Sequence, residues 1–183
     1  STYLGGSLND CGNSIWIRSN DESVYCTGGT CSSDFPVTTG AYATQYLGGK
    51  SDAFVIRISS GGNQLLASTF LGSNDYDQGY FIQSDSKNRI YIYGQSMGNF
   101  PIVNTGTVAP LLNPGRHQFI ARLNPALSGL TKSTVFGNYT TNVDISPSAF
   151  AVDRCANMYL SGWGGNIITN GPPLQNKIGR AHV

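Results

Sequence analysis

The sequence is poor in charged residues, and this scarcity limits the folds and functions open to it. Only 11% of its residues are charged, Glu22 is the only glutamate, and the formal net charge is +1. Long amphipathic helices are not expected, because glutamate and lysine are common helix-forming surface residues. The small net charge gives no reason to expect nucleic acid as a partner. No apolar run approaches the roughly 20 residues of a membrane-spanning helix, so no membrane span is expected.

Residues that bind metals or act as catalytic bases are also sparse. The chain has two histidines and four cysteines, and no two cysteines form a Cys-x-x-Cys pair. A zinc site would need such a cluster, and a serine hydrolase would need a histidine beside its nucleophile. His117 falls at the start of an expected strand, which favours a surface position. We therefore expect no metal, no cofactor and no catalytic residue.

The chain is rich in glycine and tyrosine, with 23 and 10 residues, and it contains a long internal repeat. Two short landmarks recur with nearly the same displacement, about 66 residues. The landmark Ser-Thr-Tyr-Leu-Gly lies at 1–5 and returns in altered form at 68–72 and 133–137; Val-Tyr-Cys-Thr-Gly lies at 24–28 and returns at 90–94 and 158–162. Such a period is typical of units that bury their faces against neighbours. It divides the chain into repeats 1–67, 68–132 and 133–177.

Alternating apolar residues predict four strands in each complete repeat. The expected strands are 13–18, 23–28, 52–58 and 64–71, then 80–85, 89–94, 117–123 and 132–137, then 148–153 and 157–162, with a further outer strand at 2–4. Four consecutive antiparallel strands per unit are typical of propeller blades. The expected fold is all-β, a partial β-propeller of about two and a half four-stranded antiparallel blades from a larger ring. A β-solenoid is the alternative, but its coils are usually shorter.

Short motifs along the chain carry a family resemblance. They are Ser1–Gly6, Val24–Gly28, Ser33–Pro36, Asp52–Ile58, Asp77–Ile82, Gln118–Ile120, Ile145–Phe150, Asp153–Cys155 and Tyr159–Gly165. Over residues 1–177 the chain resembles the bacterial seven-bladed β-propeller repeat (SBBP) region of large secreted proteins that carry PKD-like domains and a gliding-motility-associated C-terminal sorting domain. The resemblance implies a secreted or bacterial cell-surface location, type IX secretion, and the remaining blades of the same chain as partners. It supplies no catalytic residues.

The last six residues, 178–183, are expected to be foreign to the protein. Ile-Gly-Arg-Ala-His-Val back-translates to ATC GGA AGA GCA CAC GTC, which matches a common sequencing-adapter sequence whose next codon is a stop. We therefore expect an adapter-derived, non-native tail after an incomplete β-propeller over 1–177, and an internal fragment of the kind that metagenomic sequencing yields. This interpretation removes His182 from consideration.

The four cysteines fall in different parts of the repeat. Cys26 aligns with the apolar residues Ile92 and Leu160 and is expected to be a small buried hydrophobic residue. Cys11 and Cys31 lie in connections that leave a blade on the same side, so they are the disulfide candidate. A bridge between them would suit an oxidising exterior, and two unpaired thiols are the alternative.

Binding candidates lie in the connections on that same side: Asp10, Phe35, Tyr42, Tyr46, Asp75 and Asp77. Asp10 and Asp77 enter successive blades at equivalent places, and Asp144 is one position away in the third. Such carboxylates cap backbone N–H groups in turns more often than they bind calcium. The aromatic residues either stack on a sugar or pack down the long connection between the second and third strands. That connection is expected to project as a binding loop.

Two functions of different classes follow from these observations. The first is a non-catalytic secreted or cell-surface β-propeller scaffold for adhesion or for interaction with a surface protein or glycan. The alternative is a polysaccharide-active propeller enzyme, a hydrolase or lyase, that uses loop carboxylates. An enzyme needs several carboxylates directed at one pocket, whereas aspartates at equivalent turns fit structural repetition. The sequence therefore favours the scaffold.

Overall fold

The computed structural model describes residues 3–103, 117–137, 143 and 145–164. Their regular elements are β1 (Asp10–Ile17), β2 (Val24–Thr30), β3 (Asp52–Ile58), β4 (Leu65–Leu71), β5 (Asp77–Ser84), β6 (Ile90–Ser96), β7 (Gln118–Leu123), β8 (Leu130–Phe136), β9 (Ile145–Val152) and β10 (Met158–Gly164). The ten strands and the all-β class are confirmed, and β3 has the expected bounds. Within these residues, no helix is long and apolar enough to cross a membrane.

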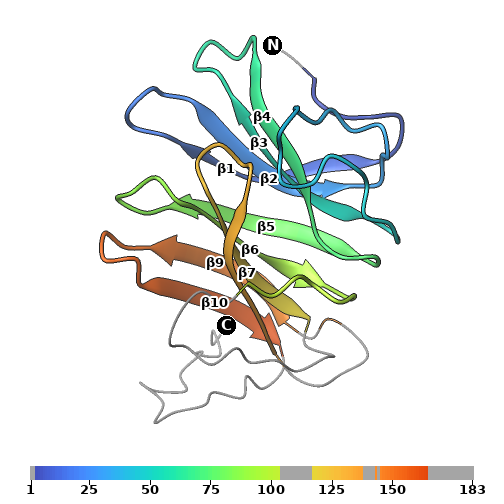
Figure 1. Cartoon of the computed structure of the whole chain (residues 1–183). Helices are drawn as coiled ribbons and strands as arrows, with labels where there is room; N and C mark the ends of the chain where they lie inside the picture. The colour runs from blue at the N-terminus through green and yellow to red at the C-terminus, as the bar shows by residue number, and fades with distance from the viewer. Residues whose placement is uncertain (1–2, 104–116, 138–142, 144, 165–183) are drawn as a thin grey trace, which may run out of the picture.

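The strands form three antiparallel sheets that follow one another along the molecule (Figure 1). The first sheet has the order β1-β2-β3-β4, the second has the order β5-β6-β7-β8, and the third is the hairpin of β9 and β10. Strand β5 contacts β1, β2 and β3, and strand β9 contacts β5 and β6. The sheets are offset from the sequence repeats, because the landmark at 68–72 begins in β4, the last strand of the first sheet.

Each sheet has two ends and two faces that recur from sheet to sheet. The short hairpin connections, such as 18–23 and 85–89, lie at what we call the turn end. The long connection 31–51 and the short connection 72–76 between the first two sheets lie at the opposite loop end (Figure 1). The upper face of the second and third sheets packs against the preceding sheet. The lower face of the first and second sheets packs against the following one.

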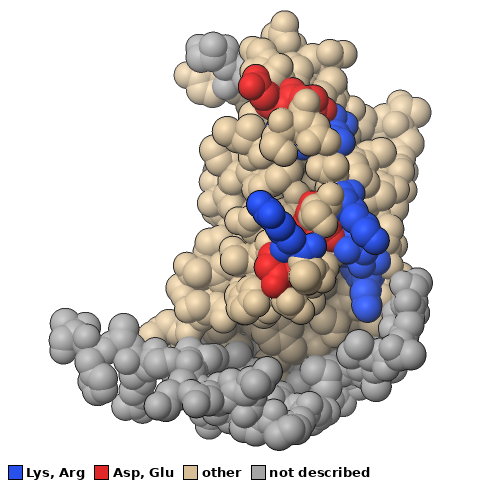
Figure 2. All heavy atoms as spheres, turned by 90° about the vertical axis from the view of Figure 1, so that its left-hand side faces the viewer, with Lys and Arg blue, Asp and Glu red and all other residues tan. Residues whose placement is uncertain are grey.

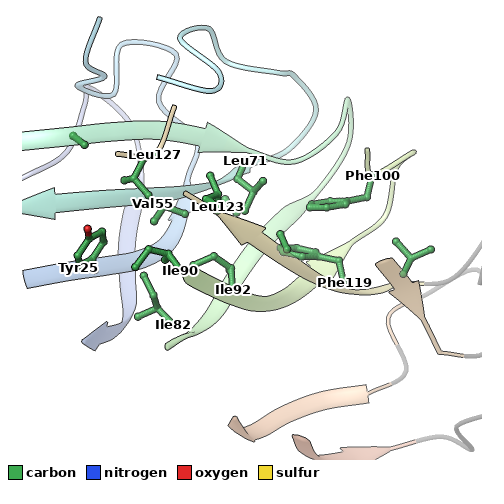
Figure 3. Close-up of a cluster of buried hydrophobic side chains, with 14 residues drawn as sticks. Tyr25, Val55, Leu71, Ile82, Ile90, Ile92, Phe100, Phe119, Leu123 and Leu127 are labelled. Atoms are coloured by element: carbon green, nitrogen blue, oxygen red, sulfur yellow. The ribbon is translucent and has the colours of Figure 1, made fainter. Parts of the chain in front are cut away.

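The largest cluster of buried side chains lies between the first and second sheets (Figure 3). The lower face of the first sheet contributes Tyr25, Val55 and Leu71, and the upper face of the second contributes Ile82, Ile90, Ile92 and Phe119. The hydroxyl of Tyr25 donates to the carbonyl oxygen of Pro125 at 2.8 Å, which satisfies the polar end of this buried ring. A second cluster joins Tyr91 and Tyr93 to Phe150. Successive sheets therefore bury their facing surfaces in a repeated manner.

The connection 31–51 folds back along β4, which corrects the expectation of a free projecting loop. The N–H of Thr38 donates to the carbonyl of Ser68 at 3.1 Å, and the N–H of Phe70 donates to the carbonyl of Ala43 at 3.1 Å. The hydroxyl of Ser68 also donates to the carbonyl of Pro36 at 2.6 Å. These bonds pair the outer edge of the sheet, where unpaired backbone groups would otherwise be exposed.

The second sheet repeats this anchoring of its long connection. The hydroxyl of Ser133 donates to the carbonyl of Pro101 at 2.6 Å, and the N–H of Ser133 donates to the carbonyl of Val103 at 2.9 Å. Ser68 and Ser133 begin the second and third copies of the first landmark. The recurrence of this serine therefore has a structural reason.

Two further expectations are wrong. His117 is buried rather than exposed, and its Nδ1 lies 3.0 Å from the carbonyl oxygen of Ser96. Leu4 lies outside any strand and Tyr3 is fully exposed, so residues 3 and 4 do not form the expected outer strand. Asp144 and the expected tail at 178–183 lie outside the described residues.

Candidate functional site

The loop end brings together the carboxylates that the sequence singled out. Asp10 begins β1, Asp77 begins β5, and Asp75 lies two residues before Asp77. The structure adds Asp52, which begins β3 and which the sequence analysis missed. The N–H of Asp77 donates to the carbonyl of Ser51 at 2.8 Å. This bond places Asp52 and Asp77 next to each other across two sheets.

Asp10 and Asp77 perform the same task in consecutive sheets. Oδ2 of Asp10 accepts the N–H of Gly6 at 2.7 Å, and Oδ2 of Asp77 accepts the N–H of Ser73 at 2.6 Å. Each acceptor lies four residues after its donor, so each carboxylate closes the turn that enters its own sheet. The hydroxyl of Thr30 also donates to Asp10. These are the bonds that a capping role requires.

Asp52 is fully buried, and burial changes its titration. Its Oδ2 accepts the N–H of Leu47 at 2.5 Å, while its Oδ1 has no hydrogen-bond partner among the described residues. Burial, with a smaller contribution from the charge of Asp77, raises the pKa of Asp52 to about 7. Burial also raises the pKa of Asp77 to about 6. The loop end therefore holds two neighbouring carboxyl groups that exchange protons near neutral pH.

These two pKa values predict how stability depends on pH. An ordinary aspartate has a pKa near 3.8, so between about pH 4 and pH 7 the folded chain binds more protons than the unfolded chain. The free energy of unfolding should therefore fall as the pH rises through this range, and should level off above it. A tenfold change in proton affinity corresponds to about 1.4 kcal/mol, and we expect a total loss of about 2 to 4 kcal/mol. Urea denaturation at pH 5, 6, 7 and 8 measures it.

The Asp52→Asn variant isolates the contribution of Asp52. Asparagine keeps an acceptor for the N–H of Leu47 but does not ionise, so the slope between pH 5 and pH 8 should become shallower. Asp34→Asn is the control, because hydrogen bonds from Ser7 hold the pKa of exposed Asp34 below its usual range. A wild-type stability that is constant or rises from pH 5 to pH 8 would contradict this account.

Phe35 and Tyr46 pack the long connection against the first sheet, whereas Tyr42 joins the connection to the second sheet. Phe35 is buried and stacks on Phe54, with 4.6 Å between ring centroids. Tyr46 lies edge-on to Phe70 at 5.8 Å. The N–H of Tyr42 donates to the carbonyl oxygen of Leu127 at 2.9 Å, and its ring packs against the cluster of buried side chains between the first and second sheets. Of the two roles considered for these residues, the structure shows loop packing, and Phe35 is too buried to stack on a sugar.

The cysteines are free thiols in the structure. Cys11 pairs in register with Gly29, whereas the N–H of Cys31 donates to the carbonyl of Asn9 at 2.9 Å. The candidate pair is thus offset by two positions across the ladder, and such diagonal neighbours are farther apart than directly opposed residues. Cys26 packs partly buried on the upper face of the first sheet, and burial raises its pKa to about 11.

The remaining candidate, Asp75, also holds the backbone of its own turn. Its Oδ1 accepts the N–H of Tyr76 at 2.7 Å. In the part of the chain that the structure describes, no group of three or more His, Cys, Asp or Glu side chains could hold a metal ion. Leu47, whose N–H is bonded to Asp52, is exposed together with Thr44 and Gln45 in the same segment. We call this segment the loop-end rim.

No protein-family model matches the chain, and no curated protein matches it in sequence.

Proposed function

We propose that the chain is part of a secreted or cell-surface β-propeller of the bacterial seven-bladed repeat type, and that it is a non-catalytic scaffold for adhesion or for binding a surface glycan or protein. The observation that carries this proposal is that the loop-end carboxylates hold their own turns. Asp10 and Asp77 make the same bond in successive sheets. A residue that repeats with the sheet serves the repeated unit first, whereas a catalytic group is needed at one place.

The propeller is supported by one position that can be followed through all three sheets. This position is held by Ile15, Ile82 and Phe150 in the first strands of the three sheets. They lie directly opposite Cys26, Ile92 and Leu160, which align with one another in the repeat. The side chains of Ile82 and Phe150 are 0% and 6% exposed beneath the preceding sheet, whereas Ile15 is 67% exposed. In a closed ring every sheet has a predecessor. Ile15 would then be covered as its two equivalents are.

Binding at the loop end is tested by introducing negative charges into the loop-end rim. The double variant Thr44→Glu and Leu47→Glu places two carboxylates on exposed positions, and it should reduce retention of the chain on a bound glycan or surface protein about tenfold or more. The thermal midpoint should stay unchanged, because both side chains are exposed and only the backbone of Leu47 is bonded to Asp52. Polysaccharide arrays and pull-down from bacterial surface extracts measure retention.

The matched control for this test is Ser19→Glu with Ser60→Glu, which adds the same charge to exposed positions at the turn end. Equal loss of binding in both double variants would show that total charge, and not the loop end, determines retention. Unchanged binding in the rim variant would remove the loop end as the binding surface.

One observation favours the enzyme alternative. Asp52 and Asp77 are neighbouring buried carboxyl groups with pKa values of about 7 and about 6, the range that suits a general acid near neutral pH. A polysaccharide-active enzyme would use this pair. If the chain releases products from a polysaccharide, and Asp52→Asn abolishes that release while the fold remains intact, the enzyme replaces the scaffold.

A further inference from the structure

The turn end of the second sheet carries more positive charge than the turn ends of the other two sheets. Figure 2 looks onto this end of the molecule, where basic side chains gather. The charged residues are Arg18, Asp21, Glu22 and Arg57 in the first sheet, Asp85, Lys87, Arg89, Arg122 and Lys132 in the second, and Asp153 and Arg154 in the third. Among the described residues, acidic and basic residues balance at the turn ends of the first sheet and of the β9–β10 hairpin, and basic residues are in excess at the turn end of the second sheet.

The excess arises from a charge reversal between equivalent positions. The β1–β2 and β5–β6 turns align through Glu22 and Asn88, which have positive φ angles of 56° and 58°. The residues just before them are Asp21 and Lys87. In the first sheet Asp21 forms an ion pair with Arg57 at 2.5 Å.

The equivalent of Arg57 in the second sheet is Arg122, since the two arginines oppose Tyr25 and Tyr91 in their ladders. At the two positions that form this salt bridge in the first sheet, the second sheet therefore carries two basic residues, Lys87 and Arg122.

A third cation adds to this unfavourable arrangement. Arg122 is directly opposite Lys132 in the ladder between β7 and β8, whereas Arg57 is opposite Ala67. Like charges directly opposite on neighbouring strands destabilise a sheet. Among the described residues, Lys87, Arg122 and Lys132 have no ion-pair partner.

Both oxygens of the nearby Asp85 carboxylate already have hydrogen-bond or ion-pair partners. Its Oδ1 accepts the N–H groups of Lys87 and Arg89 at 2.9 and 3.1 Å. Its Oδ2 pairs with the guanidinium of Arg89 at 2.5 Å and accepts the hydroxyl of Tyr91 at 3.0 Å. Asp85 therefore closes its turn and neutralises Arg89. Lys87, Arg122 and Lys132 form no ion pair among the described residues, although Nε of Arg122 donates to the hydroxyl of Thr131 at 3.0 Å.

We propose that Lys87, Arg122 and Lys132 form a binding site for the carboxylate or sulfate groups of an acidic polysaccharide. A ligand anion would take the place that the carboxylate of Asp21 occupies in the first sheet. Nε of Arg122 donates to Thr131, so the terminal nitrogens of its guanidinium would be the donors to such groups. Lys132 lies on the neighbouring strand, whose backbone is about 4.8 Å away.

The small size of the site favours a polysaccharide over nucleic acid. The excess is confined to one sheet in a chain of net charge +1, whereas nucleic acids are bound through many phosphate contacts. The site lies at the turn end, so its test is independent of the proposal that the loop end binds a ligand.

Titration calorimetry of the whole chain at low salt tests the site, with alginate as a polymer of carboxylates, dextran sulfate as a polymer of sulfates, and dextran as the uncharged control. At least one of the two charged polymers should bind, and the comparison identifies the preferred anion. Lys87→Asp restores the pattern of the first sheet and should weaken binding about tenfold or more. The same change should raise the thermal midpoint, because the new aspartate can pair with Arg122. If Lys87 had only a structural role, Lys87→Asp would not weaken binding and raise the thermal midpoint at the same time.

Two further variants keep the test decisive. Lys132→Ala reproduces Ala67 of the first sheet and should also weaken binding, even if Lys87→Asp fails to fold. Lys50→Asp makes the same charge change at an exposed position of the loop end and should bind as the wild type does. Single-stranded DNA, titrated in the same way, is the nucleic-acid control. The proposal is overturned if neither charged polymer binds, if dextran or single-stranded DNA binds equally well, or if Lys50→Asp weakens binding as much as Lys87→Asp.

Discussion

Replacing Gly28 with alanine is expected to prevent the first sheet from folding. A Cβ atom at this position would lie 1.8 Å from the carbonyl oxygen of Cys11 and 2.9 Å from the Cα of Gly12. The approach is this close because β1 bulges between Gly12 and Ser14, opposite Gly28. Backbone atoms cannot move aside without breaking the β1–β2 ladder. The cost should reach about 5 kcal/mol or more, the whole stability of many domains.

Circular dichroism and thermal unfolding measure this loss, and two other glycines make the test specific. Gly94 is the equivalent residue of the second sheet, where a Cβ would lie 2.3 Å from the carbonyl oxygen of Gln78, so Gly94→Ala should be equally damaging. Gly61 lies in an exposed turn and its Cβ would meet only Asn63, at 3.5 Å. Gly61→Ala should therefore change stability by no more than about 0.5 kcal/mol. Cooperative unfolding of Gly28→Ala at the wild-type temperature would contradict the described ladder.

The same bulges explain why the sequence misplaced the starts of two strands. The expected strands at 13–18 and 80–85 begin at or just after the bulges at Gly12/Ser14 and Gly79/Phe81, whereas β1 and β5 begin earlier. A bulge inserts one residue and so shifts the alternation of side chains. The residues before it are therefore out of phase with those after it. Strand β3 pairs with β2 without a register shift, and its bounds were predictable from alternation alone.

The candidate site was predictable where it repeats and unpredictable where it depends on tertiary packing. Asp10 and Asp77 could be matched by the repeat. Phe35 could not be assigned to the core, because its ring partners Phe54 and Phe70 lie in later strands. A connection rich in Gly, Ser and Thr reads as a free loop until its bonds to β4 are known. Asp52 is the first residue of a strand made mostly of apolar residues. Its place at the start of that strand was the signal in the sequence for a buried carboxylate.

The two isoleucines at one repeat position are expected to respond very differently to truncation. Ile82 is fully buried between the first two sheets, so Ile82→Ala should reduce the free energy of unfolding by about 2 to 5 kcal/mol. Ile15 is 67% exposed, so Ile15→Ala should cost no more than about 0.5 kcal/mol in the monomer. Urea denaturation of dilute protein compares them. Equal costs would show that Ile15 is covered in solution.

The chain itself is expected to associate through the faces at the two ends of its stack of sheets. The upper face of the first sheet exposes Ile15 and Ile17, and the lower face of the third exposes Tyr159 and Trp163, which are 59% and 79% exposed. Inside the chain, upper faces pack on lower faces, so one copy can offer its lower face to the upper face of another in a head-to-tail contact. Association should make the apparent stability depend on concentration.

Sedimentation velocity over a range of concentrations tests this association. The double variant Ile15→Glu and Ile17→Lys keeps the net charge and should remain monomeric where the wild type associates, because charged side chains on this face cannot be buried unpaired. Leu66→Glu is the control, since it alters an exposed apolar residue of β4 that is 39% exposed. A wild-type chain that stays monomeric and unfolds cooperatively at high concentration would mean that the upper face needs no covering sheet. It would thereby remove the main structural support for a larger ring.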